Sequence, residues 1–190
     1  MQHTLWTVVI PVKGTSEAKS RLGGSAQLAH ALALDTVEAA LGAAAVIVVT
    51  PLGNAAAFEA LGARVVPDAG GGLSGAVATG IQAAADGPVA VLLGDLPALQ
   101  SSELSAALAA ASTRERSFVP DSEGSGTTLI ASTTDHAPAF GAGSAQRHRD
   151  NGYVELGVAA DSGLRSDVDT PEQLAQLEGR LGPRTRASLR

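Results

Sequence analysis

The sequence predicts an α/β three-layer sandwich, in which helices cover both faces of a mostly parallel mixed sheet. Short apolar runs rich in β-branched residues alternate with segments of helical periodicity, four times in succession between residues 5 and 111. These runs are apolar throughout, as expected of strands that are buried on both faces. With 190 residues and no cysteine, the chain is long enough to bury a conventional core without disulfides.

The alternation begins with a strand at 5–12, where LWTVVIPV is apolar and partly β-branched. A helix follows at 26–41, because apolar residues recur there at helical spacing and Gly42 then ends the pattern. The same alternation predicts strands at 45–50, 63–66 and 88–95 and helices at 54–61, 74–85 and 101–111.

Beyond residue 111 the alternation becomes irregular. Three further strands are predicted, at 117–120, 127–132 and 153–158. The last helix begins at Thr170-Pro171, because a capping threonine, a proline in the first turn and Gln173 are typical of a helix start. Residues 1–182 are expected to form one domain, and residues 183–190, with three arginines and no acid, a basic and flexible tail.

Charge and composition exclude several classes of function. The chain has 13 basic and 19 acidic residues, a formal net charge of −6 and no basic run, so we expect no nucleic-acid surface. The first apolar run ends at Pro11 and Lys13, too short for a membrane span, and no basic leader precedes it. We therefore expect a cytoplasmic protein without a membrane partner, either a monomer or a homodimer.

The loop after the first predicted strand is a candidate phosphate site. Both lysines of the chain, Lys13 and Lys19, lie in it together with Arg21. Backbone N–H groups around Gly14 and three flanking cations can hold a triphosphate. The spacing is not that of a Walker A loop, and an ordinary solvated loop is the alternative interpretation.

A glycine-rich turn, DAGGGLSGAV, follows the third predicted strand. Gly70, Gly72 and Gly75 satisfy the spacing G-x-G-x-x-G, which resembles a dinucleotide-binding turn. Such a turn normally follows the first strand of the fold, whereas this one follows the third. Two alternatives are a flexible turn and a close approach of a nucleotide base to the backbone.

Three aspartates are candidate metal ligands. Asp95 ends an apolar strand, where a carboxylate is costly unless it is solvated, caps a turn or binds a metal. Asp167 and Asp169 point the same way if the chain is extended there, and paired carboxylates favour a divalent cation. The alternatives are that Asp95 turns the chain and that Asp169 or Thr170 caps the last helix.

Small residues and a helix start predict an anion site in the last third of the chain. Gly141 and Ser144 open a helix that carries Arg147, so free N–H groups, a hydroxyl and a cation lie together. Thr127 begins a strand after a glycine-rich approach. His148, on the same helix, is expected at the surface.

In their order, the motifs IPVK and AKSRL, GLSGAV, GDLPAL, GTT, FGAGS-x-x-x-H and DVDTP resemble the 2-phospho-L-lactate guanylyltransferase family, over residues 5 to about 178. Its actinobacterial branch uses phosphoenolpyruvate. The resemblance implies a nucleotide-diphospho-sugar transferase fold of the GT-A, Rossmann-like type. It also implies transfer of GMP from GTP to phosphoenolpyruvate or 2-phospho-L-lactate, with release of pyrophosphate, in biosynthesis of the deazaflavin coenzyme factor 420. The products would be enolpyruvyl- or lactyl-diphospho-guanosine.

Carried over motif by motif, the resemblance implies sets of site residues that overlap. The expected catalytic residues are Lys13, Lys19, Arg21 and Asp95. The expected nucleotide-binding residues are Lys13, Gly14, Lys19, Gly72, Leu73 and Ser74. The expected acceptor-binding residues are Thr127, Gly141 and Ser144, and the expected ligands of Mg²⁺ or Mn²⁺ are Asp95, Asp167 and Asp169.

Two other functions remain open at this point. One is another nucleotidyltransferase of the same fold that acts on a molybdenum cofactor or a sugar phosphate. The other is a non-catalytic nucleotide-binding module that uses the glycines of residues 70–75. The enzyme is favoured, because a binding module does not need the acid pair Asp167 and Asp169.

Overall fold

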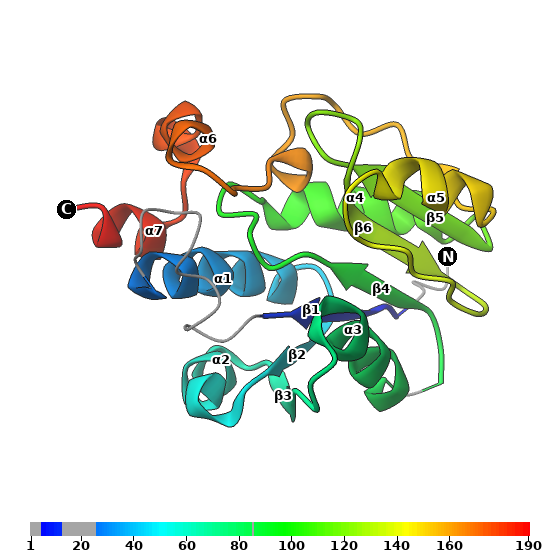
Figure 1. Cartoon of the computed structure of the whole chain (residues 1–190), viewed down its shortest axis with the longest axis horizontal. Coiled ribbons are helices and arrows are strands. Elements are labelled where there is room, and N and C mark those ends of the chain that lie inside the picture. The colour runs from blue at the N-terminus through cyan, green and yellow to red at the C-terminus, as the bar shows by residue number, and fades with distance from the viewer. Residues whose placement is uncertain (1–4, 13–25, 85) are drawn as a thin grey trace.

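The computed structural model describes residues 5–12, 26–84 and 86–190 (Figure 1). A mixed sheet of seven strands lies at the centre of this part of the chain, in the order β3-β2-β1-β4-β6-β5-β7. The strands are β1 (Thr7–Pro11), β2 (Ala45–Thr50), β3 (Arg64–Pro67), β4 (Val89–Leu92), β5 (Arg116–Pro120), β6 (Thr127–Ser132) and β7 (Val154–Glu155). The α-helices are α1 (Ala26–Leu41), α2 (Ala55–Leu61), α3 (Gly72–Ala83), α4 (Ser101–Ala111), α5 (Ser144–Asp150), α6 (Pro171–Gln176) and α7 (Pro183–Ser188).

One strand of the sheet, β6, runs opposite to the other six described strands. β1 pairs in parallel with β2 and β4, and β2 pairs in parallel with β3. β6 runs antiparallel to both β4 and β5, and β7 is parallel to β5. The chain extends the sheet from β1 through β2 to β3 and then returns to the other side of β1 with β4. The switch point of the topology therefore lies between β1 and β4, which is where open α/β sheets bind their ligands.

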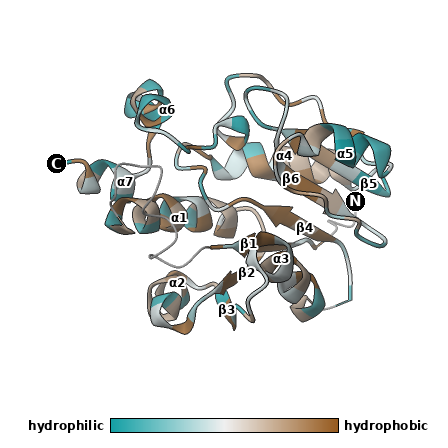
Figure 2. Cartoon of the chain, in the orientation of Figure 1, coloured by the Kyte–Doolittle hydropathy of each residue, from teal (hydrophilic) through white to brown (hydrophobic). Residues whose placement is uncertain are grey.

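The core lies on both faces of the sheet, as the apolar runs predict. In β1, Val8 and Ile10 join the cluster beneath α1, α2 and α4, whereas Val9 joins the cluster beneath α3 and α5. Gly80 lets α3 pack closely, because a Cβ there would lie 2.2 Å from Val9 Cγ1. Figure 2 shows hydrophobic residues concentrated in β1, β2 and β4, and hydrophilic residues over α6.

The sequence analysis predicted the fold class, and the structure confirms it: the sheet is mixed, mostly parallel and covered by helices on both faces. Four elements, α1, β2, α4 and β6, coincide with their predicted bounds. The predicted strand 153–158 is much shorter, because β7 is an edge strand that pairs only with β5 along two residues of the described chain. β4 also ends early, at Leu92, although the N–H of Leu93 still donates to the carbonyl oxygen of Thr128 in β6 at 2.9 Å.

The C-terminal residues 183–190, for which the sequence predicts a flexible basic tail, contain the helix α7, which packs against α1. Asp35 of α1 is 6% exposed, and its carboxylate accepts hydrogen bonds from the backbone N–H groups of Arg184 (3.1 Å) and Thr185 (2.8 Å). These two N–H groups lie in the first turn of α7, which leaves them without helical acceptors. A buried carboxylate of α1 therefore caps α7.

Among the described residues, no helix has both the length and the apolarity needed to cross a membrane.

Candidate active site

The candidate site lies along one edge of the sheet. The carboxyl ends of β1, β2, β3 and β4 meet there because these strands are parallel. The amino end of β6 joins them, because β6 is antiparallel to β4 with Leu92 opposite Leu129. The glycine turn before α3, the aspartate after β4 and Thr127 at the start of β6 therefore share this edge. Lys13, Gly14, Lys19 and Arg21, which follow β1 in the sequence, lie outside the described residues.

The glycine turn after β3 has a backbone that only glycine adopts readily. Gly70, Gly71 and Gly72 have φ angles of +91°, +85° and +67°, and the N–H of Gly70 donates to Asp68 Oδ1 at 2.8 Å. A Cβ at Gly75 would lie 2.1 Å from the carbonyl oxygen of Gly70, so the turn folds tightly onto the first turn of α3.

The turn presents the start of α3 at the edge of the sheet. Gly72 and Ser74 are exposed, and Leu73 packs against the core beneath α3. The first N–H groups of a helix of this length have no helical acceptor and favour an anion.

The predicted metal ligands lie on two segments that contact each other. The backbone N–H of Val168 donates to the carbonyl oxygen of Asp95 at 3.0 Å. Val168 is 1% exposed and anchors its segment in the core, whereas Asp169 is exposed and Asp167 half-buried beside it. The structure therefore joins the segment of Asp95 to that of Asp167 and Asp169.

Asp167 lies in a strongly acidic environment. Burial, followed by the charges of Asp121, Asp169 and Glu123, raises the pKa of the Asp167 carboxyl to about 6. Asp121 also shapes the loop after β5, because its carboxylate accepts from the N–H groups of Ser125 (3.0 Å) and Gly126 (2.7 Å). Within residues 5–12, 26–84 and 86–190, no cluster of three or more acidic or histidine side chains has a geometry that could hold a metal. Among these residues, the aspartates thus form no complete protein cage.

Two turns bring the expected acceptor-binding residues together. Gly141 has a φ of +113°, and its carbonyl oxygen accepts from the N–H of Ser144 at 3.0 Å, which closes the turn that opens α5. The next N–H, of Ala145, donates to the carbonyl oxygen of Ser125 at 3.1 Å. Ser125 precedes Thr127 by two residues, so the first turn of α5 is attached to the loop that leads into β6.

Thr127 and His148 form a buried polar contact beneath this turn. Thr127 is 3% exposed, and its Oγ1 lies 2.9 Å from His148 Nδ1. His148 is 0% exposed, so the expectation that it lies at the surface is wrong. On α5 the apolar Ala145 and His148 are three residues apart and share the inner face, and three aromatic rings surround the imidazole. Burial, and then the charge of the neighbouring Arg147, lowers the pKa of His148 to about 4.

Arg147 has a different role from the one that its place near a helix start suggested. Its guanidinium donates to the carbonyl oxygens of Ala139 (3.1 and 2.9 Å), Phe140 (3.2 Å) and Ala142 (2.6 Å). These contacts use most of its donors on the backbone of the loop before α5. Arg147 therefore holds the loop in shape.

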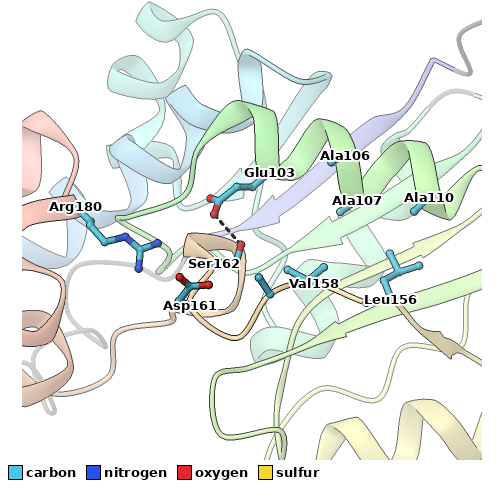
Figure 3. Close-up of a pocket in the computed structure, with 11 residues that line it drawn as sticks. Glu103, Ala106, Ala107, Ala110, Leu156, Val158, Asp161, Ser162 and Arg180 are labelled. Atoms are coloured by element: carbon cyan, nitrogen blue, oxygen red, sulfur yellow. Dashed lines mark hydrogen bonds between the residues drawn. The ribbon is translucent and has the colours of Figure 1, made fainter.

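A cavity of about 490 Å³ lies elsewhere, between α4 and the segment 156–162 (Figure 3). No residue of the predicted site lines it. Its most polar wall is formed by Glu103, Asp161, Ser162 and Arg180. The carboxylate of Glu103 already accepts from Ser162 Oγ (2.8 Å) and the N–H of Gly163 (3.0 Å), so it serves to hold two segments together.

The fold corresponds to that of a known class of enzyme. Residues 14–154 match the family described as the MobA-like NTP transferase domain. A nucleotidyl transferase from Methanothermobacter has the same fold, with a TM-score of 0.66 and 20% identity, over 92% of this chain and 96% of that one. A protein of Mycobacterium tuberculosis in complex with manganese is also similar, with a TM-score of 0.61 and 18% identity, over 93% of this chain and 98% of that one.

Curated relatives are more similar in sequence. The chain is 47% identical to a phosphoenolpyruvate guanylyltransferase of Streptomyces scabiei, over 96% of this chain and 95% of the relative. It is 48% identical to a phosphoenolpyruvate guanylyltransferase of Streptomyces coelicolor, over 96% of this chain and 94% of the relative. The protein therefore belongs to the nucleotidyltransferase family that contains the phosphoenolpyruvate guanylyltransferases, and it is an enzyme of that class.

The sequence analysis missed two features of this site. One is the pair of hydrogen bonds by which Asp121 holds the loop that leads into Thr127. The only signal for it in the sequence was an aspartate followed by small residues, PDSEGSG. The other is the contact between Thr127 and His148, which lie 21 residues apart. The pattern of α5 held a signal for this contact, because His148 is three residues beyond Ala145 on its inner face.

Proposed function

We propose that the protein transfers GMP from GTP to phosphoenolpyruvate, with release of pyrophosphate and formation of enolpyruvyl-diphospho-guanosine. One observation carries the proposal. The glycine turn that opens α3 and the turn that opens α5 are both suited to anions, and they share the sheet edge that bears Asp95 and the segment 167–169. A site for two phosphate-bearing substrates with acids between them is what this reaction requires. The names of the similar relatives support the same substrates.

The reaction needs positioning and charge neutralisation more than proton removal. The second pKa of a phosphate monoester is about 6, so the attacking oxygen of the acceptor is already ionised at neutral pH and needs no general base. It bonds to the α-phosphorus of GTP, and the bond from that phosphorus to the bridging oxygen breaks, so that pyrophosphate leaves with the electron pair. In this proposal Lys13, Lys19 and Arg21, with the backbone around Gly14, hold the triphosphate.

The start of α3 is the proposed guanosine site. The N–H groups of Gly72, Leu73 and Ser74 contact the nucleotide there. The left-handed glycines of the turn support this assignment, because the backbone around them has no side chain to keep a ligand away.

Asp95, Asp167 and Asp169 are the proposed ligands of Mg²⁺ or Mn²⁺. Their donors are all oxygens, the kind that these ions prefer, and the buried position of Asp167 beside other carboxylates favours a cation there. Mg²⁺ in nucleotide sites is typically held by one or two carboxylates together with substrate phosphates, so an incomplete protein cage fits it. When bound, the ion neutralises charge on the phosphates.

Thr127, Gly141 and Ser144 are the proposed acceptor-binding residues. Phosphoenolpyruvate and 2-phospho-L-lactate each carry a carboxylate and a phosphate, and the hydroxyls of Ser144, in the first turn of α5, and Thr127, at the start of β6, can donate to either. We propose phosphoenolpyruvate as the first candidate, because the similar relatives are named for it, and 2-phospho-L-lactate as the second. The proposal includes a cytoplasmic location, in the biosynthesis of a deazaflavin coenzyme, and either a monomeric or a homodimeric state.

The test is pyrophosphate release by the purified protein with Mg²⁺ and GTP. Phosphoenolpyruvate, 2-phospho-L-lactate and no acceptor form three parallel reactions, and CTP and UTP replace GTP in matched controls. We expect release with GTP and phosphoenolpyruvate that exceeds every control. Release that does not exceed the reaction without acceptor contradicts the proposed function, and faster turnover of CTP or UTP points to a different nucleotide.

A further inference from the structure

The contact between His148 and Thr127 has a defined direction. We propose that His148 is a positioning residue of the acceptor site, whose Nδ1–H donates to Thr127 Oγ1 and thereby commits the threonine hydroxyl to donate its own proton to an anionic oxygen of the acceptor. The inference rests on the proposed function, because it concerns how the acceptor is held.

The direction follows from the second nitrogen of the ring. The backbone N–H of Ala139 donates to His148 Nε2 at 3.0 Å, so Nε2 carries a lone pair and no proton. A neutral imidazole has one N–H, which must then be on Nδ1. Nδ1 lies 2.9 Å from Thr127 Oγ1 and donates to it. The threonine oxygen accepts from the ring, and its hydroxyl proton is available to another partner.

The surroundings of the ring keep it neutral. The imidazole is 0% exposed, and its centroid lies 5.3 Å from the rings of Phe140 and Tyr153 and 6.0 Å from that of Phe118. Arg147, the preceding residue of α5, disfavours a second positive charge. The phenol oxygen of Tyr153 accepts from the N–H of Ala137. A protonated ring would also lose the contact with Ala139, because both of its nitrogens would be donors.

The same helix turn fixes Ala139 from both sides. His148 accepts from the N–H of Ala139, and the guanidinium of Arg147 donates to the carbonyl oxygen of Ala139. Ala139 lies two residues before Gly141, so the loop that carries the proposed acceptor contacts is attached to the ring that orients Thr127. One imidazole thereby links the two halves of the proposed acceptor site, the start of β6 and the loop before α5.

Two variants separate the two hydrogen bonds of the ring. In H148N the amide nitrogen can take the place of Nδ1 and donate to Thr127. In H148Q the longer side chain places its carbonyl oxygen near Nε2, where it can accept from Ala139, but nothing replaces the Nδ1–H. We expect H148Q to raise the KM for phosphoenolpyruvate by about tenfold or more, the loss of one hydrogen bond to a charged group. We expect H148N to stay within about threefold of the wild type, and neither to change the KM for GTP by more than about twofold.

Thr127 provides the matched control. T127V removes the hydroxyl and should raise the KM for phosphoenolpyruvate as H148Q does, whereas T127S, which keeps the hydroxyl, should raise it less. In the double variant T127V/H148Q the two effects should not add, because both remove the same hydrogen bond to the acceptor. Additive effects in the double variant would overturn the inference. So would H148Q and H148N changing kcat and the KM values for both substrates to the same extent, because that result would show a merely structural role.

A measurement on the wild-type protein requires neither activity nor a variant that folds. Long-range ¹H–¹⁵N correlation spectra report which nitrogen of each histidine carries the proton. The signal of His148 is assigned from its contacts with the rings of Phe140 and Tyr153. We expect the neutral Nδ1–H tautomer at pH 7, and an Nε2–H tautomer or a charged ring overturns the inference. If the wild type does not turn over phosphoenolpyruvate, the proposed function fails, while this spectrum still decides the state of His148.

Discussion

At the scale of single residues, His148 shows how burial sets the chemistry of a side chain. A histidine at the surface has a pKa near 6.5 and is therefore partly charged at neutral pH. The pKa of His148 is about 4, so its imidazole is neutral at that pH. The cause is the aromatic enclosure, together with a helix neighbour that is itself a cation. The side chain therefore acts as a fixed donor and acceptor.

This burial predicts how stability depends on pH. The unfolded chain binds a proton to His148 below about pH 6.5, but the folded chain does not until about pH 4. The contribution of His148 is thus fully present above pH 6.5 and is lost as the pH falls toward 4. We expect this residue to account for about 3 kcal/mol of lost unfolding free energy across that window.

Urea unfolding at intervals from pH 4 to pH 7.5 measures the effect, with H148Q as the reference because glutamine does not titrate. The wild type should lose more stability than H148Q over this range. Parallel curves for the two proteins would mean that His148 takes up a proton equally well in the folded and unfolded chains.

At the scale of elements, close contacts determine where helices pack. α3 crosses β1 and β2 at Gly80, where a Cβ would lie 2.2 Å from Val9 Cγ1 and 2.9 Å from Val49 Cγ2. We expect G80A to destabilise the protein by about 2 kcal/mol, because the added methyl group overpacks a well-filled core. Thermal or urea unfolding checks this, with G179A as the control, since a Cβ at Gly179 has open space. An unfolding free energy for G80A equal to that of G179A would refute the close approach.

The attachment of α7 depends on one carboxylate. In D35N the amide nitrogen, which is a donor, would replace one of the two carboxylate oxygens that accept from the N–H groups of Arg184 and Thr185. Two donors would then face each other. We expect D35N to lose about 2 kcal/mol of unfolding free energy, in the range for a buried hydrogen bond to a charged group. E38Q is the matched control, because Glu38 is half exposed and pairs with Arg184 at the surface, where such pairs contribute at most about 1 kcal/mol. A loss in E38Q as large as in D35N would assign the attachment to the surface pair.

Elements were predictable where local pattern and burial agree. The bounds of α1, β2 and α4 followed from runs that are buried as their apolar residues predict. The short length of β7 and the packing of α7 were not predictable, because an edge strand and a docked helix depend on distant partners, β5 and Asp35.

The site residues that could be predicted were again those with a local sequence pattern, and those that depend on distant partners could not be. Asp95, Asp167, Thr127 and Ser144 were selected by motif and by their place after or before strands, and the structure brings their segments to one edge. His148 was missed because its partner lies 21 residues away in the chain. Its spacing of three residues from Ala145 was the local signal, but so short a pattern does not by itself separate a buried histidine from an exposed one. The loop of Lys13 and Lys19 lies outside the described residues, and its role stays a prediction.

At the scale of the whole molecule, the proposed metal site can be tested without disturbing the core. Asp95 lies beyond the end of β4 rather than in the core, so D95A should fold with a melting temperature near that of the wild type. We expect its kcat/KM to fall at least about 100-fold, because charge on the phosphates is no longer neutralised. Pyrophosphate release with Mg²⁺, GTP and phosphoenolpyruvate gives the rate, and D161A, in the separate cavity, is the control. Activity of D95A comparable to that of D161A would remove Asp95 from the metal site.

The antiparallel pairing of β4 with β6 has a consequence for how this enzyme can change. Residues before 96 supply the proposed nucleotide side of the site and residues after 120 its acceptor side, and the two meet along one seam, from Val89 opposite Ser132 to Leu92 opposite Leu129. If the proposed assignment holds, selection can alter the acceptor side through substitutions in one continuous stretch of the gene while the other stretch preserves the nucleotide side. Such a division lets a lineage acquire a new acceptor in small steps, with the nucleotide chemistry inherited intact.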